Sequence, residues 1–210
     1  MDVRELCGSR VLRVLLVGLA LCALGAAPAA AEDAQAALPS DPVTISSITY
    51  QGDGCPAGTA GTAIREDLQS AEIIYDQFLV RAGSAVSDSA RKSSCRVTLT
   101  VQTPTGWSWA ASLRQAGYVL APPNVTARTT VRLGTTGGGS GAPIGTDSFA
   151  GPRDEDYLVQ YDTEPRRSGG TCGGPSSATF TTEIGFVGNP RPDGVMSVDN
   201  SKFAIVGVPC

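Results

Sequence analysis

The segment CRVTLTVQT, residues 95–103, decides the fold class of this 210-residue chain. Apolar and polar residues alternate strictly along it, so one face would carry Cys95, Val97, Leu99 and Val101. A period of two is the period of a β-strand whose one face is buried and whose other face meets water. The segment therefore predicts a strand of an antiparallel sheet with one buried face.

Similar alternation recurs in short runs that Gly, Pro, Asn and Asp separate from one another. We predict further strands at residues 43–50, 107–113, 117–121, 125–133, 157–161, 178–186, 195–198 and 203–208. In the first run the alternation slips at Ser46 and Ser47, which predicts a β-bulge. About nine or ten short strands of this kind are typical of an all-β, antiparallel β-sandwich, which is the fold we expect.

Residues 64–78 fit two secondary structures. Their apolar side chains follow spacings of four, three, four and three, which is typical of an amphipathic helix. Residues 73–80, however, are rich in residues that favour a buried strand. The spacing alone leaves helix and strand open.

The N-terminus has the three parts of a secretory signal peptide. Arg4, Arg10 and Arg13 precede an apolar run at residues 14–24, and alanines at 29–31 provide a cleavage motif. The run is too short to span a bilayer, which needs about 20 residues. We predict a signal peptide at 1–31, a disordered lead-in at 32–42 and a single β-sandwich domain at 43–210, secreted or extracytoplasmic and without a membrane span after cleavage.

Four cysteines remain after this cleavage: Cys55, Cys95, Cys172 and Cys210. An even number in an exported chain predicts two disulfides, with three connectivities open. We favour Cys55 with Cys95 and Cys172 with Cys210. A zinc site is not expected, because the chain has no Cys-x-x-Cys pair and no histidine.

The absence of histidine also excludes Ser-His-Asp and Cys-His nucleophile systems and histidine-based zinc proteases. Charged residues are 17% and hydrophobic residues 41% of the chain, which fits a folded, non-membrane domain. Without residues 1–31 the chain has 13 basic and 18 acidic residues, and this negative balance argues against a nucleic-acid partner. We expect a protein without cofactor or catalytic activity.

Three segments and the C-terminal cysteine together resemble one family: SSITYQGDGCP at 46–56, DSARKSSCRVTLTVQTPTGW at 88–107 and GYVLAPPNVTA at 117–127. In their order they resemble the secreted domain-of-unknown-function family 4360. The resemblance implies an exported, cysteine-paired β-sandwich, of a kind found in bacteria and fungi, with a strand around residues 73–78. It brings no catalytic or binding residue, and the glycine-rich stretch at 134–145 departs from the family pattern.

Two tryptophans are candidates for a ligand platform. Trp107 and Trp109 lie two residues apart and so face the same side of a strand, where they could stack on a sugar ring. Burial in the core is the favoured alternative, because both continue an inward series.

Carboxylates are the other candidates for chemistry. Glycoside hydrolysis needs two acids about 5–9 Å apart, and the sequence offers Glu66, Asp67, Glu72, Asp76, Asp154, Glu155, Asp156 and Glu183. Glu183 is the best single candidate, although nothing in the sequence pairs it with a second acid. We place Asp154, Glu155 and Asp156 in a solvated loop, as weak candidates for calcium without EF-hand spacing.

The remaining patterns favour structural interpretations. Ser89 and Lys92 match Ser-x-x-Lys, but its companion motifs are missing. Arg128 and Arg132 share the wet face of one strand, which is more typical of a solubilising face or an edge guard than of a binding site. The glycine-rich stretch predicts a flexible hairpin tip, and Asn124 is a glycosylation acceptor only in a eukaryotic source.

We therefore expect a secreted, non-catalytic β-sandwich that acts at a cell surface, in a matrix or in ligand binding, with a glycan or another extracellular protein as partner. One alternative is a carbohydrate-binding module, which requires Trp107 or Trp109 to be exposed. The other is a carboxylate-dependent glycan hydrolase.

Overall fold

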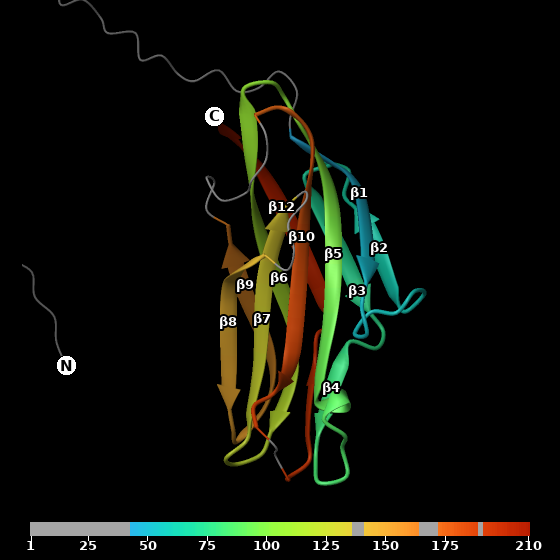
Figure 1. Ribbon diagram of the computed structural model, residues 1–210, viewed down its shortest axis with the longest axis vertical. Helices are drawn as coiled ribbons and strands as arrows, with labels where there is room; N and C mark the ends of the chain where they lie inside the picture. The colour runs from blue at the N-terminus through green and yellow to red at the C-terminus, as the bar shows by residue number, and fades with distance from the viewer. Residues whose placement is uncertain (1–42, 136–140, 164–171, 189–190) are drawn as a thin grey trace, which may run out of the picture. The chain divides into compact units, whose positions relative to one another are not determined.

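A computed structural model describes residues 43–135, 141–163, 172–188 and 191–210. Within them the chain forms two antiparallel sheets that face each other, and a 3-10 turn, η1 (Ser89–Arg91), is the one helical element. Figure 1 shows the strands of these sheets, and the buried side chains of both sheets form one hydrophobic core between them. The all-β, antiparallel sandwich expected from the alternation is confirmed.

The first sheet has five strands, in the order β1-β5-β10-β7-β8. Their bounds are β1 Thr44–Gln51, β5 Lys92–Thr103, β10 Gly174–Phe186, β7 Thr126–Thr135 and β8 Ala142–Ala150. In Figure 1, β5, β10 and β7 stand side by side in the middle of this sheet. The central strand, β10, is hydrogen-bonded along both edges, to β5 and to β7.

The second sheet has seven strands, organised around the 15-residue strand β6 (Trp107–Ala121). One edge of β6 pairs with β12 and β11, and its other edge pairs with β9. The remaining strands extend the sheet beyond β12 and β11. The bounds are β2 Ala60–Ile64, β3 Ser70–Tyr75, β4 Leu79–Ala82, β9 Arg153–Asp162, β11 Gly194–Ser197 and β12 Asn200–Pro209.

The described residues form twelve strands rather than nine or ten. The strands expected at 107–113 and 117–121 are one strand, because Gly117 continues β6. A Cβ atom at Gly117 would lie 2.1 Å from the carbonyl oxygen of Ser197, so only glycine permits the close approach of β11 here. The sequence did not predict β2, β4 and β8. These strands are short or lack a clean alternation of apolar and polar residues.

Residues 64–78 contain a turn and a strand rather than a helix. Leu68 has a φ angle of 54°, and the N–H of Leu68 donates to the carbonyl of Arg65 within the turn that joins β2 to β3. Residues 70–74 then pair with β12. The strand implied by the family resemblance is confirmed, and the helical spacing was coincidental.

Two further expectations concern local geometry. The register between β1 and β5 shifts between Ile45 and Ser47, which confirms the bulge. Glycines at the ends of the expected hairpin tip are in strands, because β7 reaches Thr135 and β8 begins at Ala142. The signal peptide, the lead-in at 32–42 and the tip itself at 136–140 lie outside the described residues.

Both favoured disulfides are present. Cys55 is bonded to Cys95, which ties the loop after β1 to β5, and both residues are buried. Cys172 is bonded to Cys210, which ties the segment before β10 to the residue after β12. Each disulfide therefore joins segments about 40 residues apart, and such bonds stabilise a fold chiefly by restricting its unfolded chain.

The core combines apolar packing with one polar connection between the sheets. Phe180 of the first sheet packs against Phe203 of the second, with ring centroids 5.1 Å apart. Beside them Gln115, which is 1% exposed, donates from Nε2 to Thr182 Oγ1 and to Ser201 Oγ at 2.9 Å each. Thr182 belongs to β10, so these hydrogen bonds join the two sheets.

Tyr75 extends this polar connection. Its hydroxyl donates to Ser201 Oγ at 3.2 Å, and burial raises the pKa of Tyr75 to about 12. The hydroxyl therefore stays neutral over the physiological pH range.

Among the described residues, no helix is long and apolar enough to cross a membrane.

Replacing Gln115 by alanine tests the connection. We expect Gln115→Ala to lower the free energy of unfolding by about 2–4 kcal/mol, because it leaves a cavity and removes the hydrogen bonds to two buried hydroxyls, of which Ser201 keeps the one from Tyr75. Urea denaturation measures this loss. Arg114→Ala, on the exposed side of the same strand, is the control, with an expected change within about 0.5 kcal/mol. Equal effects of the two substitutions would show that the polar connection contributes nothing.

Candidate functional site

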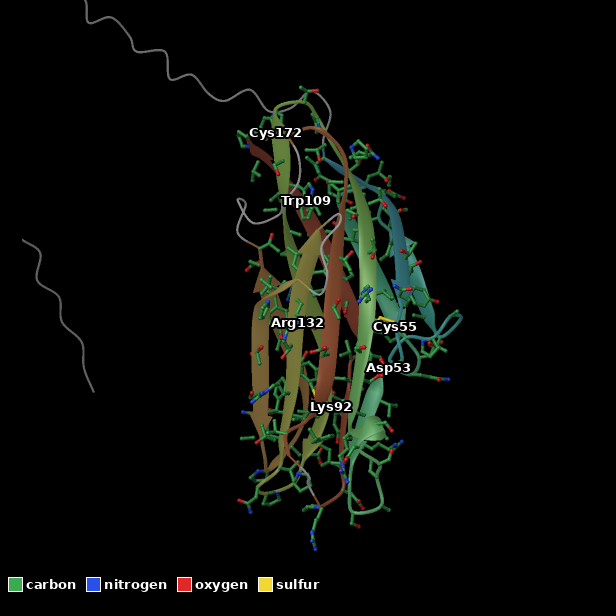
Figure 2. All side chains as sticks on the ribbon, viewed as in Figure 1. Asp53, Cys55, Lys92, Trp109, Arg132 and Cys172 are labelled. Atoms are coloured by element: carbon green, nitrogen blue, oxygen red, sulfur yellow. A yellow bond between two sulfur atoms is a disulfide. The ribbon has the colours of Figure 1, made fainter. Side chains whose placement is uncertain are left out.

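A groove crosses the outer face of the five-stranded sheet. It encloses about 730 Å³ and lies over the middle strands β5, β10 and β7. Its polar lining includes Lys92, Ser94, Arg128, Thr130, Arg132 and Glu183. Figure 2 labels Lys92 on β5 and Arg132 on β7 of this sheet.

The pairing register places the lining residues in rows across the three strands. Ser94, Glu183 and Thr130 are direct neighbours on β5, β10 and β7. Two residues along the strands, Lys92 and Arg128 flank Gly185. Side chains two residues apart point to the same face of a strand, so both rows project into the groove.

On the other side of the Glu183 row lies a third row, in which Arg96 and Arg132 flank Thr181. Arg96 is exposed and points outward, because its neighbours Cys95 and Val97 are both buried. Four cations thus surround one carboxylate on the outer face of the sheet. They are Lys92, Arg96, Arg128 and Arg132.

Glycine at position 185 keeps the floor of the groove open. A Cβ atom there would lie 3.0 Å from Lys92 Cγ and 3.0 Å from the carbonyl oxygen of Arg91. The missing side chain therefore lets the stem of Lys92 lie close to β10, and Gly185 itself forms part of the groove lining.

Within the described part of the chain, Arg128 and Arg132 form only weak contacts with other side chains. Arg128 Nε donates to Ser148 Oγ at 3.4 Å, and Arg132 Nε lies 4.0 Å from Glu183 Oε2. These distances are at the outer limit of hydrogen bonds and ion pairs. The guanidinium groups therefore keep donors for a ligand.

Asp53 is the second carboxylate at the groove, but it has a structural task. Its Oδ1 accepts hydrogen bonds from the N–H of Gly54, from the N–H of Ser94 and from Ser94 Oγ, at 3.1, 2.8 and 2.9 Å. These bonds fasten the loop beside Cys55 to β5. Asp53 and Glu183 thus lie on opposite sides of Ser94 and both are exposed, but Asp53 Oδ1 is already occupied by three donors.

The tryptophans do not form a platform. Trp109 is completely buried, and its Nε1 donates to Ser176 Oγ of the opposite sheet at 2.8 Å. Trp107, at the start of the same strand, is half-buried. The interpretation of Trp109 as a core residue is confirmed, and a stacking surface made of both rings is contradicted, because one ring has no face open to a ligand.

Asp154, Glu155 and Asp156 lie in strand β9 rather than in a loop. Successive side chains of a strand point to opposite faces, so the three carboxylates do not converge on one ion. Asp154 Oδ1 instead accepts a hydrogen bond from the Tyr118 hydroxyl at 2.5 Å, which raises the pKa of Tyr118, and Glu155 pairs with Arg153. Among the described residues, no three His, Cys, Asp or Glu side chains gather where they could hold a metal ion.

The other acidic candidates have separate structural contacts. Glu72 pairs with Arg65 at 2.7 Å and with Lys202 at 3.5 Å. Hydrogen bonds from Gln69 and Ser70 lower the pKa of Asp67, which holds a turn. Neither carboxylate lines the groove.

Two patterns from the sequence take on other roles. Ser89 lies in the short turn η1 with its Oγ 3.1 Å from Ser87 Oγ, while Lys92 begins β5 and lines the groove. The strand of Arg128 and Arg132 is paired on both sides, so it is no edge strand and the edge-guard interpretation is wrong. Asn124 is exposed in the turn before β7, with a φ angle of 63°.

The sequence alone does not reveal the groove. It places Arg128 and Arg132 together on the wet face of one strand and offers Glu183 as an unpaired acid, and it does not single out Arg96 or Asp53. The available signal was the period of two itself, which places charged residues on the outer faces of three strands. Only the register between the strands brings them together.

Comparisons with known proteins match the chain to a family and to a secreted relative. The family model described as Domain of unknown function (DUF4360) matches residues 41–207. An uncharacterized secreted protein of Arthroderma benhamiae is 25% identical over 174 residues, covering 80% of this chain and 71% of that protein. The structure of TmCBM61 in complex with β-1,4-galactotriose covers 80% of this chain and 91% of its own, at 10% identity and a TM-score of 0.27. That score is too low to support an argument about binding.

Fluorescence quenching tests the position of Trp109. In the variant Trp107→Phe, Trp109 is the remaining indole, and we expect iodide to leave its fluorescence almost unquenched because the ring is fully buried. Trp109→Phe is the matched variant, in which Trp107 should be quenched measurably. Strong quenching of Trp109 in folded Trp107→Phe protein would return this residue to the candidates for a ligand platform.

Proposed function

Since the chain belongs to the family described as Domain of unknown function (DUF4360), we propose a function from its own surface: a secreted, non-catalytic module that binds an extended polar ligand. The ligand lies in the groove over β5, β10 and β7. The observation that carries the proposal is this open groove, whose charged side chains stand on the central strands of a sheet.

The floor of the groove supports binding because it is rigid. β10 is paired along both edges, and its inward residues Phe180, Ile184 and Phe186 are each 1–2% exposed. The outward residues between them are therefore held in fixed positions before a ligand arrives. Such preorganisation lowers the entropy cost of binding.

The chemistry of the lining favours a ligand rich in hydroxyl groups. Ser94 Oγ donates to Asp53 and Thr130 Oγ1 is hydrogen-bonded to Thr146 Oγ1, but each hydroxyl oxygen can accept a further hydrogen bond from a ligand, and the guanidinium groups offer several donors each. Phe186 borders the groove but is 2% exposed, so it offers no stacking face. Hydrogen bonds rather than ring stacking would hold the ligand, and a glycan chain fits these donors and acceptors.

The carboxylates of the groove support binding rather than hydrolysis. Glycoside hydrolysis needs one carboxyl group as proton donor and a second as base or nucleophile. Asp53 Oδ1 already accepts three hydrogen bonds that fasten a loop, and Glu183 stands next to Arg132. The chain has no histidine, so an imidazole cannot act as the base here.

Secretion agrees with the covalent structure and with the relative. Two disulfides are typical of proteins that leave the reducing cytosol. The relative from Arthroderma benhamiae is described as a secreted protein. A module with a glycan or another extracellular ligand as partner fits this location.

Filling the groove tests the proposal. We expect Thr130→Trp to weaken binding to soluble polysaccharides at least about tenfold. The large ring would project from β7 into the groove beside Glu183 and occupy space that the ligand needs. Calorimetric titration against acidic and neutral polysaccharides gives the affinities. The matched control is Thr62→Trp on the exposed face of β2 in the other sheet, which should bind like the wild type.

Two results would contradict this account. In the first, Thr130→Trp folds with an unchanged melting temperature and binds like the control, which places the ligand elsewhere. In the second, the protein releases sugars from a polysaccharide and Glu183→Gln stops the release, which makes the groove an active site.

A further inference from the structure

From the four cations on this face, we infer that the ligand is an acidic polysaccharide, a chain of sugars that carry carboxylate groups. The inference rests on the proposed function and adds the chemical class of the ligand. Lys92 and Arg96 on β5 face Arg128 and Arg132 on β7 across the central strand. Glu183 lies between them.

The cations occupy the corners of a rectangle whose dimensions follow from sheet geometry. Neighbouring strands lie about 4.8 Å apart, so residues on β5 and β7 are about 10 Å apart across β10. Four residues along a strand separate Lys92 from Arg96 and Arg128 from Arg132, which is about 13 Å. The rectangle is larger than a single phosphate or carboxylate group.

The side chains do not converge on its centre. Arg128 reaches toward Ser148 on β8, away from Lys92, and Arg132 lies beside Glu183. The carboxylate of Glu183 would repel a compact anion in the middle of the groove. The arrangement therefore suits a long ligand with anionic groups at intervals, which meets the cations at separate places.

Charge is segregated on this face. The chain has 16 basic and 20 acidic residues, yet on this part of the outer sheet surface four cations stand against two carboxylates, Glu183 and Asp53. On the other sheet, by contrast, Glu72 is neutralised by two cations at 2.7 and 3.5 Å. A local positive surface on an otherwise acidic protein attracts anionic ligands to that place.

Two other anionic polymers fit less well. Nucleic acids bind proteins largely by stacking of bases on exposed aromatic rings or by a strongly basic surface, and the groove has no exposed aromatic side chain among its described residues. An acidic peptide gains most by adding a strand to a sheet edge, and β10 has both edges occupied. A hydroxyl-rich lining with separated cations matches a polyhydroxylated chain that carries carboxylates.

Titration with two related polysaccharides tests the inference. We expect the mature protein to bind polygalacturonate, with an affinity that falls as salt is raised, and to bind neutral galactan at least about tenfold more weakly. The double variant Lys92→Gln/Arg128→Gln should lose about tenfold or more of the affinity for polygalacturonate, because two charge-assisted contacts are lost. The matched control is Arg81→Gln/Arg114→Gln, two exposed arginines of the other sheet with the same change in net charge.

The outcomes separate this inference from the proposed function. In one outcome, galactan binds as tightly as polygalacturonate, the double variant does not change this affinity, and Thr130→Trp abolishes binding. This outcome would overturn the acidic ligand and support the groove as the binding site. Equal loss in the control variant would show a general charge effect and overturn the inference. Poly-glutamate or single-stranded DNA bound as tightly as polygalacturonate would overturn the choice of a sugar. If Thr130→Trp weakens the binding of none of the polysaccharides, or if none of them binds, both proposals would be overturned.

Discussion

The structure depends on the burial of alternate residues of β10 between the two sheets. Phe180 and Ile184 point into the core, and this burial fixes Thr181, Glu183 and Gly185 on the opposite face. A slip of one residue would exchange the two sets and bury a carboxylate, which costs far more than the strand pairing gains. The same constraint that stabilises the sandwich therefore determines which side chains line the groove.

Buried polar contacts add specificity to this packing. Gln115 and Trp109 both lie on β6 and donate hydrogen bonds to Thr182 and Ser176 of β10. A buried hydrogen bond contributes little net free energy, but its loss leaves an unpaired polar group in the core. These two contacts thus favour one alignment of the sheets over alignments that would satisfy apolar packing alone, and they hold β10 in place beneath the groove.

The two-residue alternation of apolar and polar residues and the number of cysteines predicted the fold from the sequence. The site could not be predicted in the same way, because it depends on which strands are neighbours in the sheet. The alternation at residues 95–103 gave the strand β5 correctly, because a half-buried strand shows its two faces in its residues. Asp154 and its neighbours were assigned to a loop because a run of charges resembles one, although they belong to β9. The groove joins Lys92, Arg128 and Glu183 from three distant parts of the chain, and only the strand order β5-β10-β7 makes them neighbours.

The proposed ligand lies over the middle of the five-stranded sheet, and mapping the binding surface would show whether it does. Amide NMR spectra of the ¹⁵N-labelled protein would be recorded during titration with a short oligogalacturonate. The account predicts that the shifted amides cluster on β5, β10 and β7 around Glu183, with the second sheet unchanged. Shifts centred on the Trp107 end of the sandwich or on β12 and β3 would contradict it.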